Sequence, residues 1–281
     1  MPHGAISLFL LAFAALASAP AAAQLPTAPV IHVSLVGEQE SIVPRQEFWV
    51  GVQFRLGKGW HIYWVNPGDS GEPPRVQWRL PAGFQAGELQ WPHPERLVTK
   101  YSVDYGYADQ VLLLAPMRSP AGLAPGGKAE LGGTVKWVVC REVCIPGKTE
   151  VALSLPVTRS AAPKPGKSFE EARKRIPQPA PAHWRVRARA EKDAFVLSIE
   201  AGRPLAQAVF FPLQPQQIEN SAPQAASAFP RGVRLRLKRS EQLLKPLANL
   251  KGVIVLPSGK AYVIDAPVTG AGAKYPKTKK S

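Results

Sequence analysis

The sequence predicts an all-β protein in which one β-sandwich is followed by a second, smaller β-sandwich. Short runs of alternating apolar and polar residues recur along most of the chain, as in half-buried strands. Turns rich in proline and glycine, with 30 prolines and 23 glycines in the 281 residues, separate these runs. Only 168–176 has a helical pattern, with acidic residues in its first turn and basic residues near its end.

The first half contains about eight strand candidates. The clearest is 47–56, where alternate apolar residues share one face. The others are 30–36, the aromatic run 59–64, 75–80, 87–91, 104–107, 111–115 and the two arms of a hairpin, 134–139 and 148–155. This number of short strands matches an immunoglobulin-like sandwich, although the Cys…Trp…Cys pattern between sheets is missing.

The second half repeats this style without cysteines. Its strand candidates are 184–190, 194–200, 207–211, 233–237, 252–256 and 261–265. They predict the second, smaller β-sandwich.

The N-terminus has the features of an export signal. An apolar stretch at 8–17 precedes Ala21-Ala22-Ala23, which predicts cleavage before Gln24. No later segment approaches the ~18 apolar residues of a membrane span, so we expect a mature protein outside the cytoplasm. The predicted organisation is a signal peptide (1–23), a first β-domain (24–158), a Pro/Lys-rich linker (159–182), a second β-domain (183–268) and a basic tail (269–281).

The net charge of +15 is confined to one half of the chain. Residues 24–158 hold 12 Lys/Arg and 12 Asp/Glu, whereas residues 159–281 hold 23 and 8. A basic half can rest on anionic lipid or an acidic partner, and it can also be an ordinary solvated surface. Nucleic acid is not expected as a partner, because the exported chain shows none of the binding motifs.

The two cysteines, Cys140 and Cys144, are close together at the expected tip of a hairpin. In an oxidising compartment this pair can form a disulfide. Three roles remain open from spacing alone. A short exposed loop favours a reducible redox pair, a structural disulfide would close a loop too short to stabilise much, and two thiolates can bind Cu(I) but not complete a zinc site.

Several segments around the cysteines resemble one known family. They are 59–64 (GWHIYW), 66–71 (NPGDSG), 105–107 (YGY) and 137–147 (WVVCREVCIPG). Residues 28–157 are thereby similar to the amino-terminal domain of DsbD-like and ScsB-like thiol:disulfide interchange proteins. The Cys-x₃-Cys spacing and a looser match at 210–212 favour the ScsB-like branch, because the classical DsbD domain spaces its cysteines further apart.

The resemblance implies an immunoglobulin-like periplasmic domain that relays electrons by dithiol–disulfide exchange. By motif position Cys144 matches the cysteine that forms mixed disulfides, and Cys140 matches the one that resolves them. The partners would be thioredoxin-fold periplasmic proteins and a separately encoded membrane thiol reductase, and no cofactor or resident metal is implied. A basic second half could add peripheral contact with the membrane surface.

The family's cap loop, which shields the cysteines, corresponds here to the segment around Tyr101, Val103 and Tyr105. The phenylalanine of the classical cap has no counterpart, since Asp104 falls near its place. Asp104 is a candidate proton acceptor near the pair, as is Asp69, although turn chemistry also explains Asp69.

Other polar residues are weaker candidates. His61 and His93 can carry protons, but histidines in half-buried strands are more often structural. The cations Lys136, Arg141 and Lys148 surround the pair and could lower a thiol pKa, although Glu142 opposes them.

Overall fold

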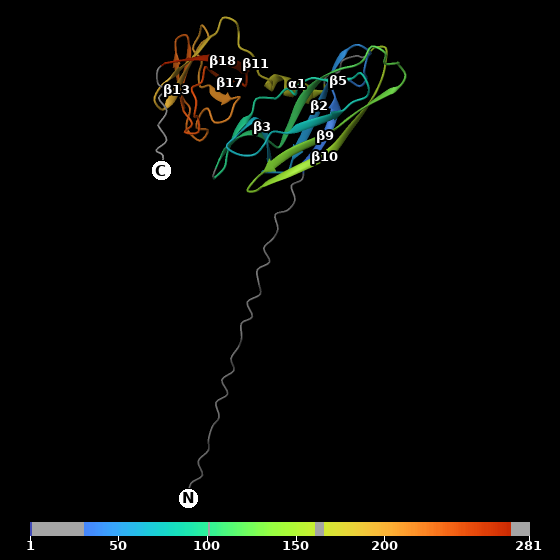
Figure 1. Cartoon of the computed structure of the whole chain (residues 1–281), viewed down its shortest axis with the longest axis horizontal. Helices are drawn as coiled ribbons and strands as arrows, with labels where there is room; N and C mark the ends of the chain where they lie inside the picture. Colours follow the sequence, from blue (N-terminus) through green and yellow to red (C-terminus); the bar gives the residue numbers. More distant parts are fainter. Residues whose placement is uncertain (2–30, 101, 161–165, 271–281) are drawn as a thin grey trace.

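The computed structural model describes residue 1 and residues 31–100, 102–160 and 166–270. Apart from Met1, the predicted signal peptide therefore lies outside the described residues, as do Tyr101 and most of the predicted basic tail. Two β-domains are visible, with the short helix α1 (Lys167–Arg175) between them (Figure 1). In the described part of the chain, no helix is a candidate for crossing a membrane.

The first domain is an immunoglobulin-like sandwich of two antiparallel sheets. One sheet has the order β1-β2-β8-β5, formed by β1 (Ile31–Gly37), β2 (Glu47–Leu56), β8 (Gln110–Arg118) and β5 (Gln85–Ala86). The other sheet has the order β10-β9-β3-β7-β6, and β4 also pairs with β9. Its strands are β3 (His61–Gly68), β4 (Arg75–Arg79), β6 (Glu95–Val98), β7 (Val103–Ala108), β9 (Lys128–Cys140) and β10 (Cys144–Pro156).

Strands β3 and β7 are buried on both faces. Their inward side chains, Ile62, Trp64, Tyr105 and Tyr107, belong to the core between the sheets. Because side chains alternate along a strand, His61 and Tyr63 of β3 point to the outer face instead. They are nevertheless only 6% and 0% exposed, so the outer face of this sheet is itself covered.

The second domain is one eight-stranded sheet that curls around its own core. Its order is β14-β17-β18-β12-β13-β16-β15, with β11 also paired to β18. The strands are β11 (Gln178–Pro179), β12 (Arg185–Ala190), β13 (Ala194–Glu200), β14 (Val209–Pro212), β15 (Ala225–Phe229), β16 (Gly232–Lys238), β17 (Asn249–Val255) and β18 (Ala261–Thr269). A parallel β12–β18 pairing joins the two halves of this smaller sandwich.

The predicted helix is confirmed at Lys167–Arg175, inside the region predicted as a linker. Its buried residues Phe169 and Ala172 pack against Leu112 and Leu114 on β8, so this part of the region is attached to the first domain. Phe169 and Ala172 are three residues apart, so they form a single apolar stripe that the sheet can cover.

The two domains are in direct contact. Phe211, Val253 and Ala261 of the second domain belong to the same buried apolar cluster as the core of the first domain. The Phe211 ring lies edge-on to Tyr105, with 5.2 Å between ring centroids, and similarly to Trp64 at 6.3 Å. The second domain therefore closes one end of the first domain's core instead of being held away from it.

Most predicted strands are confirmed to within a few residues, and 47–56 and 194–200 match β2 and β13 in full. The prediction of a strand at 87–91 is wrong. The adjacent Gln85–Ala86 pairs with β8 instead, and only Gln90 forms an isolated bridge to Leu114. The short edge strands β6 and β15 were missed, because four or five residues give little alternation to detect.

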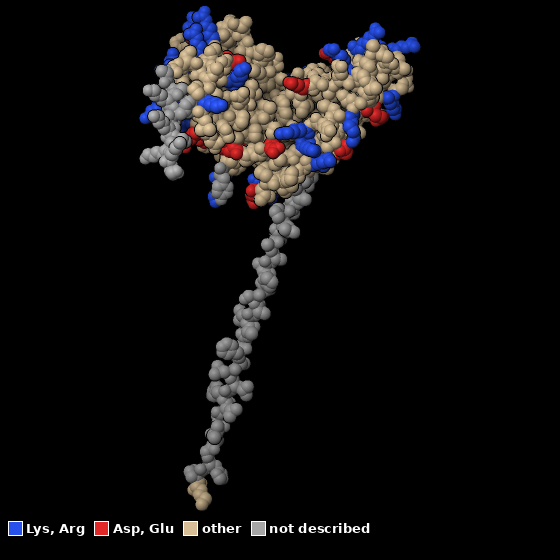
Figure 2. Space-filling view, in the orientation of Figure 1, with Lys and Arg blue, Asp and Glu red and all other residues tan. Residues whose placement is uncertain are grey.

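Basic side chains are spread over the visible faces of both domains in Figure 2. They do not gather in one patch of the second domain in this view. The described cations of the second domain are therefore distributed over the surface that this view shows.

Candidate functional site

The two cysteines are bonded to each other at the tip of the β9–β10 hairpin. Cys140 ends β9 and Cys144 begins β10, and the two residues face each other in the antiparallel register, with 4.2 Å between their Cα atoms. Three residues close the turn, and the Arg141 amide donates a hydrogen bond to the Val143 carbonyl at 3.2 Å. The hairpin predicted from sequence is therefore the element that brings the sulfurs together.

The two cysteines differ in accessibility. Cys140 is 3% exposed, whereas Cys144 and the three turn residues are exposed. Cys140 also pairs across the sheet with His61 on β3, so it lies on the covered outer face of that sheet. A reagent or protein thiol that approaches from solvent would therefore meet Cys144 first.

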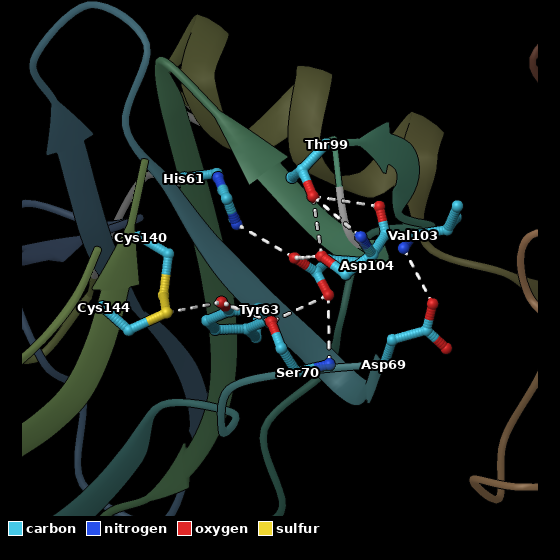
Figure 3. A network of polar contacts seen from close by, with 10 residues as sticks. His61, Tyr63, Asp69, Ser70, Thr99, Val103, Asp104, Cys140 and Cys144 are labelled. Atoms are coloured by element: carbon cyan, nitrogen blue, oxygen red, sulfur yellow. Dashed lines mark hydrogen bonds and ion pairs between the residues drawn. A yellow bond between two sulfur atoms is a disulfide. The ribbon is translucent and has the colours of Figure 1, made fainter. Parts of the chain in front are cut away.

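A buried phenol touches the accessible cysteine. The Tyr63 hydroxyl lies 3.6 Å from Cys144 Sγ and 3.2 Å from Ser70 Oγ (Figure 3). The loop after β3 covers the ring, and a Cβ added at Gly71 would lie 2.0 Å from Tyr63 Cζ. Gly71 also has a φ of +72°, so both space and backbone require glycine there.

Ser70 connects the phenol to a buried carboxylate. Asp104 is 1% exposed, and its Oδ1 accepts hydrogen bonds from Ser70 N at 3.1 Å and Ser70 Oγ at 2.9 Å. Its Oδ2 accepts one from Ser102 Oγ at 3.2 Å and lies 3.6 Å from His61 Nε2. A continuous polar chain thus runs from Cys144 through Tyr63 and Ser70 to Asp104, with His61 at its end (Figure 3).

The direction of the hydrogen bonds follows from the number of protons. Ser70 has one hydroxyl proton and gives it to Asp104, so Tyr63 must donate in its contact with Ser70. Burial raises the pKa of Tyr63, and the nearby Asp104 charge raises it further, while the hydrogen bond to Ser70 lowers it. Tyr63 therefore stays protonated at neutral pH and can donate to an anion but cannot serve as a base.

The residues singled out as a cap occupy different places. Val103 is 5% exposed and points into the core, and its amide donates to Asp69 Oδ2 at 2.8 Å. Tyr105 is on the opposite face of β7 from Asp104, because the two are adjacent in the strand. Its hydroxyl donates to Asn220 Oδ1 of the second domain at 2.8 Å. Tyr101 lies outside the described residues.

The other polar candidates are also separated. His93 is held near α1, where its amide donates to the Arg175 carbonyl at 2.8 Å, and burial lowers the pKa of its ring. Asp69 contacts Val103 and Asn220 but is not in the chain that reaches sulfur. Within the described residues, no group of three or more His, Cys, Asp or Glu side chains is arranged to hold a metal ion.

Sequence reasoning missed Tyr63 and Ser70. The signal for Tyr63 was present, because it is two residues from His61 and therefore shares its face. Ser70 lies in the motif segment 66–71, but the segment did not indicate its role, since that role depends on a bulge between β3 and β7 that pairs Gly68 with Asp104.

Two grooves flank the hairpin, and both are lined by cations. One contains Arg75, Lys136 and Lys148 beside Trp137, and the other contains Arg96, Lys100 and Arg141 beside Trp60. The Arg141 guanidinium carbon lies 5.1 Å from the centroid of the Trp60 ring, which holds this cation next to the disulfide. Six of the 12 Lys/Arg in residues 24–158 therefore line these grooves, and Glu72 is the only carboxylate among the lining residues.

Comparison with known proteins finds a family model that matches the first domain. Residues 32–156 match the family model described as "Thiol:disulfide interchange protein DsbD, N-terminal". None of the curated protein sequences compared with the chain matches it.

A solved structure shows the same fold over most of the chain. The N-terminal periplasmic domain of ScsB from Proteus mirabilis is similar with a TM-score of 0.60 at 16% identity, over 86% of this chain and 92% of that one. The reduced DsbD N-terminal domain of Neisseria meningitidis is matched over 44% of this chain and 85% of that one at 17% identity, with a TM-score of 0.26.

Proposed function

We propose that this chain, whose residues 32–156 form a domain of the DsbD amino-terminal family, is a thiol:disulfide relay that passes electrons through Cys140 and Cys144. One observation carries the proposal: an exposed Cys144 is bonded to a buried Cys140 and touched by a buried, protonated phenol. A purely structural disulfide needs neither the difference in exposure nor the polar chain behind it.

The difference in exposure gives each sulfur a role. A partner thiolate attacks Cys144, so that a partner–Cys144 disulfide forms and Cys140 leaves as a thiolate. The partner's second thiol then attacks the mixed disulfide, which releases the oxidised partner and the Cys144 thiolate. Two electrons have entered the chain, and the same steps in reverse reduce an oxidised protein.

The polar chain assists by stabilising charge on Cys144. In the disulfide state Tyr63 donates to Ser70, because a bonded sulfur is a weak acceptor. When Cys144 carries negative charge, rotation of the phenolic O–H turns the donor toward sulfur, 3.6 Å away. Asp104 keeps Ser70 oriented by accepting from its amide and its hydroxyl. Asp104 is also the proposed proton acceptor when a Cys144 thiol ionises: Tyr63 and Ser70 each pass on their own proton as they receive another in one concerted shift, so neither acts as a base by itself.

The partners that fit this chemistry are thioredoxin-fold proteins of the periplasm, together with a separately encoded membrane thiol reductase. They would dock on the exposed turn between the cysteines, where Val143 is 47% exposed, and over the cationic grooves beside it. Periplasmic location rests on the signal peptide expected at 1–23. The basic second half could add contact with an anionic membrane surface.

We propose that the segment that contains Tyr101 and ends at Val103 shields the cysteine pair. Val103 contributes through its backbone, since its side chain is in the core. Tyr105 is left out of the proposed shield, because its hydroxyl donates a hydrogen bond to Asn220 of the second domain. If the loop shields the reduced pair, Tyr101→Ala should speed alkylation of the reduced protein, and unchanged reactivity would remove the shield from the proposal.

Trapping experiments test the relay. Cys140→Ser should accumulate a mixed disulfide between Cys144 and a thioredoxin-fold protein, whereas Cys144→Ser should not, because Cys140 is buried. The opposite trapping pattern would reverse the two roles.

The reduction potential separates the relay from a structural disulfide. A potential below about −300 mV would mean that the bond resists cellular thiols and has a structural role. Titration of the reduced protein with Cu(I) tests whether the pair binds copper instead.

A further inference from the structure

The second domain reaches toward the redox site through one buried side chain, Asn220. This residue is 8% exposed and follows β14 in the chain. Its side-chain amide donates to Asp69 Oδ1 at 2.7 Å, and its side-chain oxygen accepts from Tyr105 at 2.8 Å. Its backbone carbonyl accepts from Arg96 at 2.6 Å. All three contacts are with the first domain, so Asn220 is satisfied only while the domains stay docked.

Asp69 transmits this contact to the strand that carries Asp104. The Oδ2 atom of Asp69 accepts from the Val103 amide at 2.8 Å (Figure 3). The Asp69 amide donates to the Val103 carbonyl at 3.3 Å. Asp69 is therefore bound on one side by Asn220 and on the other by both backbone groups of Val103. Each neighbour in sequence, Ser70 after Asp69 and Asp104 after Val103, belongs to the polar chain behind Cys144.

The backbone at this point leaves little freedom for other arrangements. Gly68 has a φ of +89°, and a Cβ there would lie 2.6 Å from the Val103 carbonyl oxygen and 2.9 Å from the Asp104 Cα. The loop after β3 thus lies directly against the start of β7. Ser70 can donate to Asp104 from both its amide and its hydroxyl only while these two segments stay together.

We propose that the second domain is a component of the redox site, in which Asn220 is a positioning residue that acts through Asp69 to hold Ser70 and Asp104 behind Tyr63. This inference rests on the relay function proposed above. A neutral amide suits the role, because it gives Asp69 a hydrogen bond without bringing a cation close to Asp104.

The test compares variants of the full-length protein that change one Asn220 contact at a time. Asn220→Asp keeps the shape and the acceptor for Tyr105 but places a carboxylate against Asp69. Tyr105→Phe is the matched control, since it removes the other side-chain contact of Asn220 and leaves Asp69 untouched. The readout is the pH profile of alkylation at Cys144 in the reduced protein, together with the rate of exchange with 2-mercaptoethanol.

We expect Asn220→Asp to change the alkylation rate at neutral pH by about threefold or more, since residues in one hydrogen-bond network are coupled by factors of about 2 to 100. Tyr105→Phe should leave the pH profile in place even if it lowers stability. The exchange Asp69→Asn/Asn220→Asp should restore the profile, because an amide at 69 can donate to position 220 and still accept from Val103.

The outcomes decide between positioning and plain domain attachment. A pH profile that is unchanged in Asn220→Asp, or that shifts equally in Tyr105→Phe, would overturn the inference. If Asn220→Asp does not fold, Asn220→Ala and the Asp69→Asn/Asn220→Asp exchange answer the same question, and an unchanged profile in Asn220→Ala would overturn it as well. A wild-type protein whose disulfide does not exchange with any thiol would instead refute the relay itself.

Discussion

The two faces of the β3–β7 strand pair contain the same kinds of residue and have different roles. On the outer face, Tyr63 is buried under a loop, and its hydroxyl reaches Cys144 and Ser70. On the inner face, Tyr105 is equally buried, and its ring and hydroxyl meet Phe211 and Asn220 of the second domain. Burial raises the pKa of both phenols.

The contrast shows that burial and residue type do not distinguish a reactive phenol from a structural one. Tyr63 can change its hydrogen-bond partner, because a sulfur and a serine both lie within reach. Tyr105 has a fixed amide acceptor and an aromatic neighbour, so its environment has one arrangement. The following experiments test this difference, beginning with the largest expected effect.

Removal of the Phe211 ring should weaken the inner face most. Phe211 is 4% exposed and packs between Trp64 and Tyr105, so Phe211→Ala should lower the free energy of unfolding by about 3–5 kcal/mol. Denaturant unfolding of the full chain measures the loss. Phe48→Ala is the control, because it removes a ring from the same core at a place that packs within the first domain. A loss below about 1 kcal/mol at Phe211, on the same scale, would show that the domains are not packed in solution.

Tyr63, the phenol on the outer face, should affect the rate of thiol–disulfide exchange at Cys144. Tyr63→Phe removes the only hydroxyl in contact with Cys144 among the described residues. The second step of reduction by 2-mercaptoethanol, in which the Cys144 thiolate is released, should therefore slow by about tenfold, the value of one hydrogen bond to a charged group. Tyr105→Phe should leave this rate unchanged and lower stability by about 1 kcal/mol. Equal rates in the two variants would remove the proposed role of Tyr63.

High pH should destabilise the protein through its buried phenols. Burial raises the pKa of Tyr63, Tyr105 and Tyr107, so above pH 10.0 the unfolded chain loses protons that the folded chain keeps. The contribution of each phenol is complete below the unfolded pKa and is lost as the pH rises above it, at about 1.4 kcal/mol per pH unit.

Tyr105→Phe removes one of these phenols, so the free energy of unfolding should fall less steeply with pH, by about 1.4 kcal/mol per pH unit. Denaturant unfolding between about pH 9 and pH 11, around the usual tyrosine pKa, measures this slope. An unchanged slope would mean that Tyr105 is accessible to solvent in the folded protein. The same measurement on Tyr63→Phe shows whether the two faces exclude water equally.

The smallest effect should come from the cations in the two grooves. An anionic thiol, 2-mercaptoethanesulfonate, should react faster at low salt, by less than about tenfold, and lose this advantage near 1 M salt, where the Debye length is about 3 Å. The neutral 2-mercaptoethanol should show little change. Lys136→Ala/Lys148→Ala should reduce the salt dependence, whereas Lys128→Ala, at the far end of β9, should not. A wild-type rate that is independent of salt would exclude steering by the grooves.

The sequence alone determined much of the first domain. Alternation located β2 in full, and the paired strand patterns around Cys140 and Cys144 located the hairpin that brings the sulfurs together. The motif segments also identified the family that the comparison with residues 32–156 found. These features are local, because strand alternation and a tight turn depend on residues a few positions apart.

The tertiary structure decided the rest of the site and the role of the second domain. Tyr63 meets Cys144 across 81 positions of sequence, and Asp69 meets Asn220 across 151. The sequence placed Tyr105 near the cysteines, yet alternation along β7 turns it to the other face from Asp104. The sequence also suggested domains separated by a linker, whereas α1 packs on β8 and Phe211 enters the first core. Local patterns show which face of a strand is buried, but only the folded chain determines what lies opposite that face.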